Sequence, residues 1–354
     1  MTRLPVPRLL DTPHCVWDAG AQLGEGTCWS VCEQALWWVD ILGQRLLRYA
    51  PATGDRRSWG FDETVSAVAE RSSGPGLVLT SRHDLVWFDP ASGRLERLTA
   101  VEAGKPANRC NDGKCDAAGR FWSGTMDFDA TARTGALYRC LPATLPADVA
   151  PATRPADVAP ATLPADVAPA TSDAEPAAPW TFRAEAAPPA ATPSPGRCEL
   201  AFDAGYAVTN GPTWSQDGRT MFFSDTVRRE VGAFDFDPAT GALGPRRLWL
   251  RLDKGDGFPD GMTTDAAGRI WIARWGASCV TCHDPVDATE LLRVALPTRH
   301  ITNVAFGGAA LDTLYITSAR SGLSAEQLAA EPLAGGLFAV QTDAVGCPAN
   351  RYAG

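Results

Sequence analysis

Two nearly identical stretches decide the fold: DAAGRFWSGT at residues 116–125 and DAAGRIWIA at residues 265–273. In each, an Asp/Gly turn runs into a segment of aromatic and β-branched residues, which is the pattern of a β-hairpin. Three more segments share this organisation with a less regular turn: residues 32–40, 216–225 and 311–317. A second turn, in which Pro sets the first dihedral and Gly takes the positive φ, recurs at residues 50–54, 89–93 and 237–241. The chain is therefore predicted to consist of many short antiparallel strands.

The hairpin segments recur with a regular period. Six residues open the successive units: Glu25, Val65, Asn111, Asn210, Asp260 and Asn303. They are 40, 46, 99, 50 and 43 residues apart, and the long interval becomes 43 once an inserted segment is removed. Each unit has room for about four short strands. The prediction is an all-β fold, a six-bladed β-propeller, with one helix over residues 324–330 that a Ser cap and a Gln three residues later would open.

The inserted segment is Ala/Pro-rich and covers residues 142–197. It begins with three nonapeptides, PATLPADVA, PATRPADVA and PATLPADVA, and contains 13 of the 28 prolines of the chain. Its bulky apolar residues are too few to offset the entropy lost on ordering, so it is predicted to be a disordered surface insertion. The remaining 298 residues, 1–141 and 198–354, are predicted to form a single propeller domain.

Composition narrows the function classes. The 354 residues carry 41 acidic and 32 basic side chains, a formal net charge of −9, which argues against nucleic acid as a partner. No run of about 18 apolar residues indicates a membrane span, and the first residues do not resemble a signal peptide. We expect a cytoplasmic monomer whose ten cysteines are mostly reduced. Only four histidines are present, so any metal is expected to bind oxygen ligands.

Four of the six unit openings carry an Asn or a carboxylate next to glycine. The segments are LGEG at 23–26, RCNDG at 109–113, TNGP at 209–212 and PDGM at 259–262. In a propeller the innermost strands begin at one face, so these side chains would converge, and their hard oxygen donors suit Ca²⁺, Mg²⁺, Mn²⁺ or Fe(II). The alternative is that Asn-Gly and Asp-Gly simply form turns. Turn chemistry explains one such motif more readily than four at the same phase of a repeat.

Together with WVDI at 38–41, GTM at 124–126 and the C-terminal segments 319–323 and 332–339, these motifs resemble the regucalcin/gluconolactonase family of sugar lactonases. Within it, the sequence is most similar to bacterial aldonolactonases of the xylonolactonase type. The resemblance covers nearly all of the chain outside the insertion and implies the same six-bladed propeller. It implies metal ligation by Glu25, Asn210 and Asp260, and substrate binding by Arg109 and Asn111. An acidic substrate-binding residue of the family would correspond to Asp129.

The resemblance implies a carboxylic-ester hydrolase acting on a small-molecule sugar lactone such as xylonolactone. One divalent metal ion (Ca²⁺, Fe(II), Mn²⁺, Zn²⁺ or Mg²⁺) would polarise the lactone carbonyl or activate water, and Asp260 would also serve as general base. A Gly-x-Ser-x-Gly motif of serine hydrolases is absent from the sequence. The alternative function is a non-catalytic calcium-binding or protein-interaction propeller. Residues 279–283, CVTCH, also match the c-type haem attachment pattern, although they lie in an expected strand; a redox pair or incidental thiols are the other interpretations.

Overall fold

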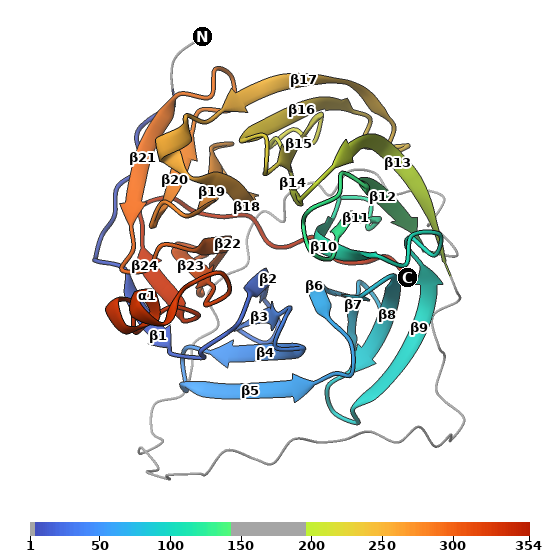
Figure 1. The fold of residues 1–354 in the computed structure, drawn as a ribbon, viewed down its shortest axis with the longest axis horizontal. Coiled ribbons are helices and arrows are strands. Elements are labelled where there is room, and N and C mark those ends of the chain that lie inside the picture. Colours follow the sequence, from blue (N-terminus) through green and yellow to red (C-terminus); the bar gives the residue numbers. More distant parts are fainter. Residues whose placement is uncertain (1–3, 143–195) are drawn as a thin grey trace.

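Six four-stranded antiparallel sheets surround a central axis in the computed structural model, which describes residues 4–142 and 196–354 (Figure 1). Blades 1 and 2 contain β2 (Gly24–Ser30), β3 (Ala35–Asp40), β4 (Arg45–Ala50), β5 (Asp55–Gly60), β6 (Val65–Glu70), β7 (Leu77–Ser81), β8 (Asp84–Asp89) and β9 (Arg94–Ala100). Blades 3 and 4 contain β10 (Asn108–Cys115), β11 (Phe121–Asp127), β12 (Gly135–Leu141), β13 (Arg197–Tyr206), β14 (Thr209–Trp214), β15 (Thr220–Asp225), β16 (Glu230–Phe236) and β17 (Leu243–Arg251). Blades 5 and 6 contain β18 (Phe258–Thr264), β19 (Ile270–Trp275), β20 (Cys279–His283), β21 (Glu290–Ala295), β22 (Ile301–Gly307), β23 (Thr313–Ser318), β24 (Leu337–Gln341) and β1 (His14–Trp17).

The ring is closed by the two ends of the chain. In blades 1 to 5 the strands follow chain order from the axis outward, whereas blade 6 takes its outer strand β1 from the N-terminal segment and pairs it with β24. The predicted six-bladed propeller is thus confirmed. Each of the six predicted unit openings lies on the innermost strand of its own blade.

Helices are a minor part of the described chain. The helix α1 (Ala325–Ala330) begins after Ser324, whose side chain accepts the backbone N–H of Gln327, while the Gln327 side chain accepts the N–H of Ser324. The predicted Ser cap is therefore present as a full capping box. A short 3₁₀ helix, η1 (Lys254–Asp256), precedes β18. Among the described residues, none of the helices has the length and apolar character needed to cross a membrane.

The two DAAGR stretches fold identically, which explains their composition. The Asp116 carboxylate accepts the backbone N–H groups of residues 118 and 120, the Arg120 Nε–H at 2.6 Å and the Trp122 indole N–H at 2.8 Å. Asp265 makes the same four bonds in blade 5. Gly119 has a φ of +79°, which favours glycine at that corner of the turn. One buried carboxylate therefore fixes the turn, the arginine and the core tryptophan together.

The core lies between the blades. Six clusters of buried apolar side chains are present in the described chain, one at each interface between neighbouring blades. The largest members are indole rings on the second strands, including Trp38, Trp122 and Trp271, all fully buried. The tryptophans of these strands are therefore packing residues, which hold the inner strands in fixed positions around the axis.

Each inner strand is irregular near its beginning. In all six blades the pairing of the first and second strands shifts register there, as between Glu25 and Cys28 in blade 1 or Pro259 and Met262 in blade 5. Such β-bulges re-aim side chains and are frequent next to active sites. The Asn-Gly and Asp-Gly pairs at the unit openings therefore lie in strand bulges, so the interpretation of these pairs as turn formers is wrong.

The predicted insertion joins β12 to β13, the two outer strands of blade 3. Residues 143–195 lie outside the described residues, so the prediction of disorder is not tested there. The predicted boundary at residue 197 is one residue too far, because Arg197, in β13, already pairs with Leu141. At its base, Cys140 and Cys198 face each other across the β12–β13 pair and form a disulfide. The sequence did not predict this bond. Five other cysteines are buried thiols: Cys28, Cys110, Cys115, Cys279 and Cys282.

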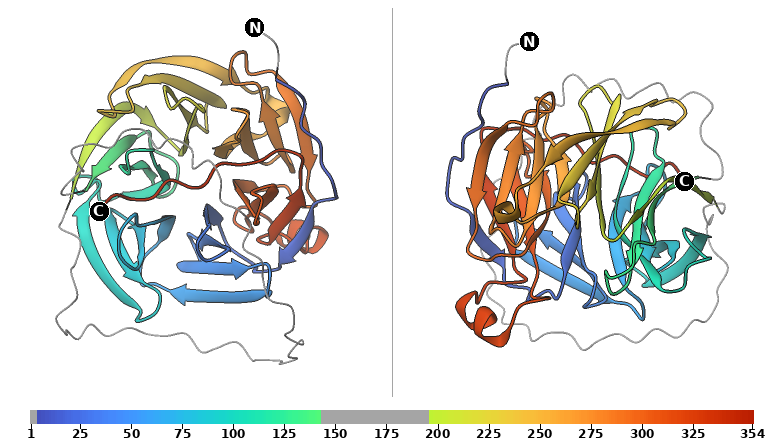
Figure 2. Two further views of the ribbon diagram at one scale, coloured as in Figure 1. Left: turned by 180° about the vertical axis from the view of Figure 1, so that it is seen from behind. Right: turned by 45° about the horizontal axis from the view of Figure 1, so that its top comes forward.

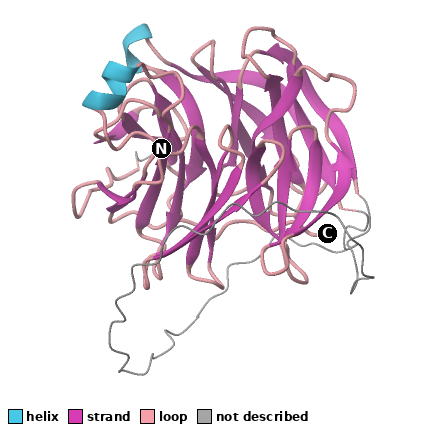
Figure 3. Ribbon diagram, turned by 60° about the horizontal axis from the view of Figure 1, so that its bottom comes forward, coloured by secondary structure: helices cyan, strands magenta, loops and turns pink. Residues whose placement is uncertain are grey.

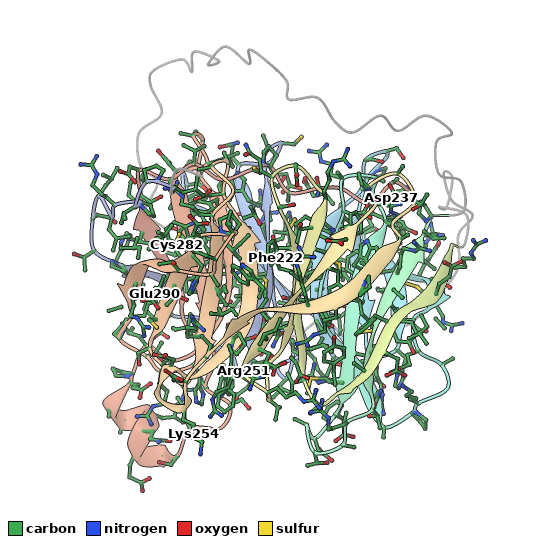
Figure 4. The ribbon with its side chains drawn as sticks, turned by 90° about the horizontal axis from the view of Figure 1, so that it is seen from above. Phe222, Asp237, Arg251, Lys254, Cys282 and Glu290 are labelled. Atoms are coloured by element: carbon green, nitrogen blue, oxygen red, sulfur yellow. A yellow bond between two sulfur atoms is a disulfide. The ribbon has the colours of Figure 1, made fainter. Side chains whose placement is uncertain are left out.

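The two ends of the central channel differ. The inner strands begin at the face that carries α1 and Lys254, here called the site face, and Figure 4 places Asp237 at the opposite, far face. Figure 3 shows α1 beyond the ends of the strands on the site face. On the far face the C-terminal segment, residues 345–354, crosses the axis (Figure 2). It is bonded to Leu311 in blade 6 and Glu70 in blade 2, and so spans the far end of the channel.

Candidate functional site

Two buried carboxyl groups face each other at the site-face end of the channel. Glu25 lies on β2 and Asp260 on β18, close enough for the Glu25 charge to act on the Asp260 carboxyl. Burial, and then the charge of nearby Asp112, raises the pKa of Glu25 to about 8. Burial raises the pKa of Asp260 well above its ordinary value, and the Glu25 charge adds to this effect. In the absence of a cation, such a pair is stable only when it retains a proton.

Asp260 has an oxygen atom with no protein partner. Its Oδ1 is buried and accepts no hydrogen bond from the described residues. Leaving a buried carboxylate oxygen unsatisfied costs about 1–3 kcal/mol or more. A cation bound between Glu25 and Asp260 would satisfy this oxygen and neutralise the repulsion of the pair.

Asn210 contributes an amide oxygen beside this pair. Its Nδ2 donates to the Thr226 hydroxyl at 2.9 Å, and that hydroxyl donates its only hydrogen to the Pro259 carbonyl at 2.9 Å. Because Thr226 has no second hydrogen to donate, Asn210 must be the donor in their contact, which fixes the orientation of the amide. Its Oδ1 is thereby turned away from Thr226 and accepts the Asn111 Nδ2–H at 2.9 Å.

Arg109 and Asn111 are part of the same buried group. The Arg109 Nη1 donates to Asn111 Oδ1 at 2.6 Å and to the Cys110 carbonyl at 3.0 Å. Burial lowers the pKa of Arg109 to about 10, against the opposing effect of the Glu25 charge, so the guanidinium remains protonated at neutral pH. Its Nε has no hydrogen-bond partner among the described residues. The structure therefore brings five of the six predicted site residues together.

Asp129 is the sixth, and it lies apart from the other five. It is exposed in the turn that follows β11, and no hydrogen bond or ion pair within residues 4–142 and 196–354 connects it to them. The neighbouring Phe128 ring is closer, with the Arg109 guanidinium carbon 5.9 Å from its centroid. A substrate-binding role for Asp129 stays a prediction.

The donor set fits a hard divalent cation. Glu25, Asn210 and Asp260 offer two carboxylates and one neutral amide, all oxygen ligands of the kind that Ca²⁺, Mg²⁺ or Mn²⁺ prefers. No cluster of three or more His, Cys, Asp or Glu side chains with metal-binding geometry occurs in the described part of the chain. The predicted ligands Glu25, Asn210 and Asp260 are not a cluster of this kind, because one of the three is an asparagine. The unpartnered Asp260 Oδ1 and the Glu25 charge beside it, both buried, are the features that favour a cation here.

Three more groups surround the predicted residues, and two of them, Asp112 and Thr226, are buried. Asp112 accepts the N–H groups of Gly113 at 2.8 Å and Gly211 at 2.9 Å, and so anchors the backbone next to Asn210. Lys114 reaches across the channel and donates to the Met262 carbonyl. Asp112 directly follows Asn111, which opens the third unit, so its position in the repeat could have identified it as a site residue. Nothing in the sequence pointed to Thr226, the third group.

The far end of the channel holds a separate cavity of about 260 Å³. Lys114, Thr213 and Thr264 line it from the inner strands, and residues 347–350 of the C-terminal segment form part of its wall. None of the six predicted site residues lines this cavity. The chemistry-bearing side chains therefore do not open into this cavity.

The haem-like segment is an ordinary strand. Residues Cys279 to His283 form β20, and all five are buried. His283 contacts Arg274 through Nε2 at 3.0 Å and Ala288 through Nδ1 at 2.8 Å, so both ring nitrogens are engaged within the protein. This arrangement favours a structural role for the segment.

Comparisons with known proteins agree with the propeller fold. The family described as "SMP-30/Gluconolactonase/LRE-like region" matches residues 23–153 and 190–320. The chain is 33% identical to an L-arabinolactonase of Azospirillum brasilense over 95% of this chain and 94% of that protein. It is 30% identical to regucalcin of Gallus gallus over 96% of this chain and 98% of that protein. The solved calcium-binding protein regucalcin of Agrobacterium tumefaciens has the same fold, with a TM-score of 0.77, 24% identity and 96% coverage of both chains. The chain belongs to the SMP-30/gluconolactonase/LRE-like family.

Proposed function

We propose that this protein hydrolyses a sugar lactone, such as xylonolactone, to the corresponding aldonic acid with one divalent cation. The observation that carries the proposal is the convergence of Glu25, Asn210 and Asp260 at one end of the channel, with the Arg109 guanidinium beside them. Family membership supports lactone hydrolysis as the class of reaction. The L-arabinolactonase relative supports an aldonolactone as the substrate class.

The proposed reaction opens a cyclic ester. Glu25, Asn210 and Asp260 would hold the cation, which when bound supplies an electrophile for the carbonyl oxygen or a more acidic water. Two carboxylates and a neutral amide leave a net positive charge at a divalent site. That charge would stabilise the oxyanion formed when water adds to the lactone carbonyl.

Asp260 is the proposed proton acceptor. Its Oδ1 has no protein hydrogen bond and is the free oxygen of the pair. It would take one proton of the attacking water and return it to the ring oxygen as the ester C–O bond breaks, giving a hydroxyl and a carboxylic acid. Ligation lowers the basicity of Asp260, so its second role depends on the raised pKa that burial produces.

Arg109 and Asn111 would orient the substrate. They are hydrogen-bonded to each other and to residues of the cation site, so their positions are fixed before substrate arrives. The Arg109 guanidinium, with an unpartnered Nε, can donate to sugar hydroxyls or to the developing oxyanion. Asp129 would contribute an acceptor only if its loop approaches the channel mouth.

A pH-indicator assay with xylono-, arabino- and glucono-lactone, with and without a chelator, tests the proposal. We expect metal-dependent acid release from at least one of them. Cation binding without hydrolysis of any lactone would contradict the proposed reaction and favour a non-catalytic calcium-binding propeller.

A further inference from the structure

Asn303 is a buried amide at the site to which neither the reaction nor the family resemblance assigns a role. It lies in the bulge of β22 in blade 6 and is fully buried. Its Nδ2 donates to Glu25 Oε2 at 2.9 Å. One amide of blade 6 therefore bonds a carboxylate of blade 1.

The orientation of the Asn303 amide is determined by its other partners. Its Oδ1 lies 2.9 Å from the backbone N–H of Val304 and 2.8 Å from the Thr27 hydroxyl. A backbone N–H can only donate, so the atom it contacts must be the amide oxygen. The NH₂ group consequently faces Glu25.

This contact leaves one oxygen of Glu25 available. Glu25 Oε2 accepts from Asn303 and also from the backbone N–H of Gly26 at 3.3 Å. With Oε2 occupied by two donors, Oε1 is the oxygen left for a cation. A Glu side chain has three rotatable bonds, and fixing it in advance removes part of the entropy cost of binding.

Gly261 makes room for Asn303. A Cβ atom built on Gly261 would lie 2.3 Å from Asn303 Nδ2 and 2.5 Å from its Cγ, far inside contact distance, and 2.8 Å from the Thr302 carbonyl oxygen. The φ angle of Gly261 is not in the left-handed region, so its backbone does not require glycine. Space is therefore the reason for glycine after Asp260.

We propose that Asn303 is a positioning residue that holds Glu25 ready to bind the cation, and that Gly261 is small so that the Asn303 amide fits. This inference rests on the proposed function, since it assumes that Glu25 is a ligand. Residues that orient metal ligands typically affect metal affinity by about 10–100-fold when they are removed. We expect losses in that range for Asn303→Ala and Gly261→Ala.

The test is calorimetric titration of the full-length, chelator-treated proteins with Ca²⁺ and with Mn²⁺. Wild type, Asn303→Ala, Gly261→Ala and the double variant are compared, with circular dichroism to verify folding. Thr80→Val is the matched control, because it removes one buried hydrogen bond, Ser66 to Thr80, from a blade that supplies no site residue. In the double variant, Gly261→Ala should add less than it costs alone, since the amide is gone and only the contact with the Thr302 carbonyl oxygen remains.

The outcomes separate the two proposals. Wild type should bind, Thr80→Val should bind equally well, and both single site variants should bind about 10–100-fold more weakly. The metal concentration for half-maximal lactone hydrolysis should rise by the same factor, with a smaller change in kcat at saturating metal. If wild type binds and both folded variants bind within about twofold of it, the role of Asn303 is overturned while the proposed function stands. Failure of wild type to bind either ion overturns the metal-dependent function itself.

Discussion

Asn111 donates its side-chain N–H to Asn210 at 2.9 Å, although 99 residues separate them in the sequence. The bond crosses from blade 3 to blade 4 and links a predicted substrate-binding residue to a predicted metal ligand. The residues proposed for substrate recognition and for cation binding therefore belong to one buried hydrogen-bonded network.

This linkage predicts the behaviour of Asn111→Ala. The change removes the bonds to Asn210 and Arg109, each worth about 1 kcal/mol, so we expect KM for the lactone to rise about 30-fold. Steady-state kinetics measure it. Asn350→Ala, which removes an amide bonded to the Cys115 carbonyl on the far face, is the control and should leave KM unchanged. An unchanged KM in Asn111→Ala would exclude Asn111 from substrate binding.

The DAAGR turns are predicted to be centres of stability. Asp116→Ala leaves the Arg120 guanidinium buried without its carboxylate, so we expect a loss of about 3–5 kcal/mol in unfolding free energy. Asp55→Ala, which removes partly exposed ion pairs with arginines, should cost less than about 1 kcal/mol. Urea denaturation distinguishes the two. Equal, small losses would mean that the buried pair does not stabilise the turn.

Much of this fold could be predicted from the sequence because the patterns that specify it are local and recur in every unit. Turns such as residues 116–120 and 265–269 specify both a hairpin and a core tryptophan, and six repeats of one unit leave few alternative arrangements. The site could be predicted only for residues that occupy the same position in successive repeat units. That rule places Glu25, Asn111, Asn210 and Asp260 together.

The rest depends on contacts between units, which local patterns do not contain. Thr226 matters only because its hydroxyl lies between Asn210 and Pro259 of the next blade. The disulfide between Cys140 and Cys198 follows from the pairing of β12 with β13 across a 58-residue separation. Gly261 looked like a turn former, and only the position of Asn303 explains it.

The disulfide predicts that the thermal stability of the protein depends on its redox state, whereas the catalytic activity does not. Closing a loop of this length restricts the unfolded chain by about 4 kcal/mol in the entropic description, so reduction or Cys198→Ser should lower Tm by several degrees. The bond is on the outer strands of blade 3, so kcat/KM at 25 °C should be unaffected. Thermal scans with and without reductant measure this effect. An unchanged Tm would mean that the bond does not form in solution.

Because His283 is buried, we predict that the protein becomes less stable as the pH falls. Burial, with the adjacent Arg274 charge, lowers the pKa of His283 to about 4 from an ordinary value of 6.5. Between these values the unfolded chain binds a proton that the folded protein does not, so stability falls as pH drops from 6.5 to 4, by about 3 kcal/mol in all. His283→Gln should reduce this dependence. Urea midpoints measured across that pH range test it, and identical slopes for both proteins would exclude His283 as the cause.

Metal-dependent lactone hydrolysis by wild type and Asp260→Ala tests the central claim most directly. Both proteins are stripped with a chelator, verified as folded, and assayed with xylonolactone before and after addition of Ca²⁺, Mn²⁺ or Fe(II). Wild type should lose activity on chelation and regain it with at least one ion, whereas Asp260→Ala should stay inactive with every ion. Full hydrolysis by Asp260→Ala, or by chelated wild type, would contradict a reaction carried out at Glu25, Asn210 and Asp260.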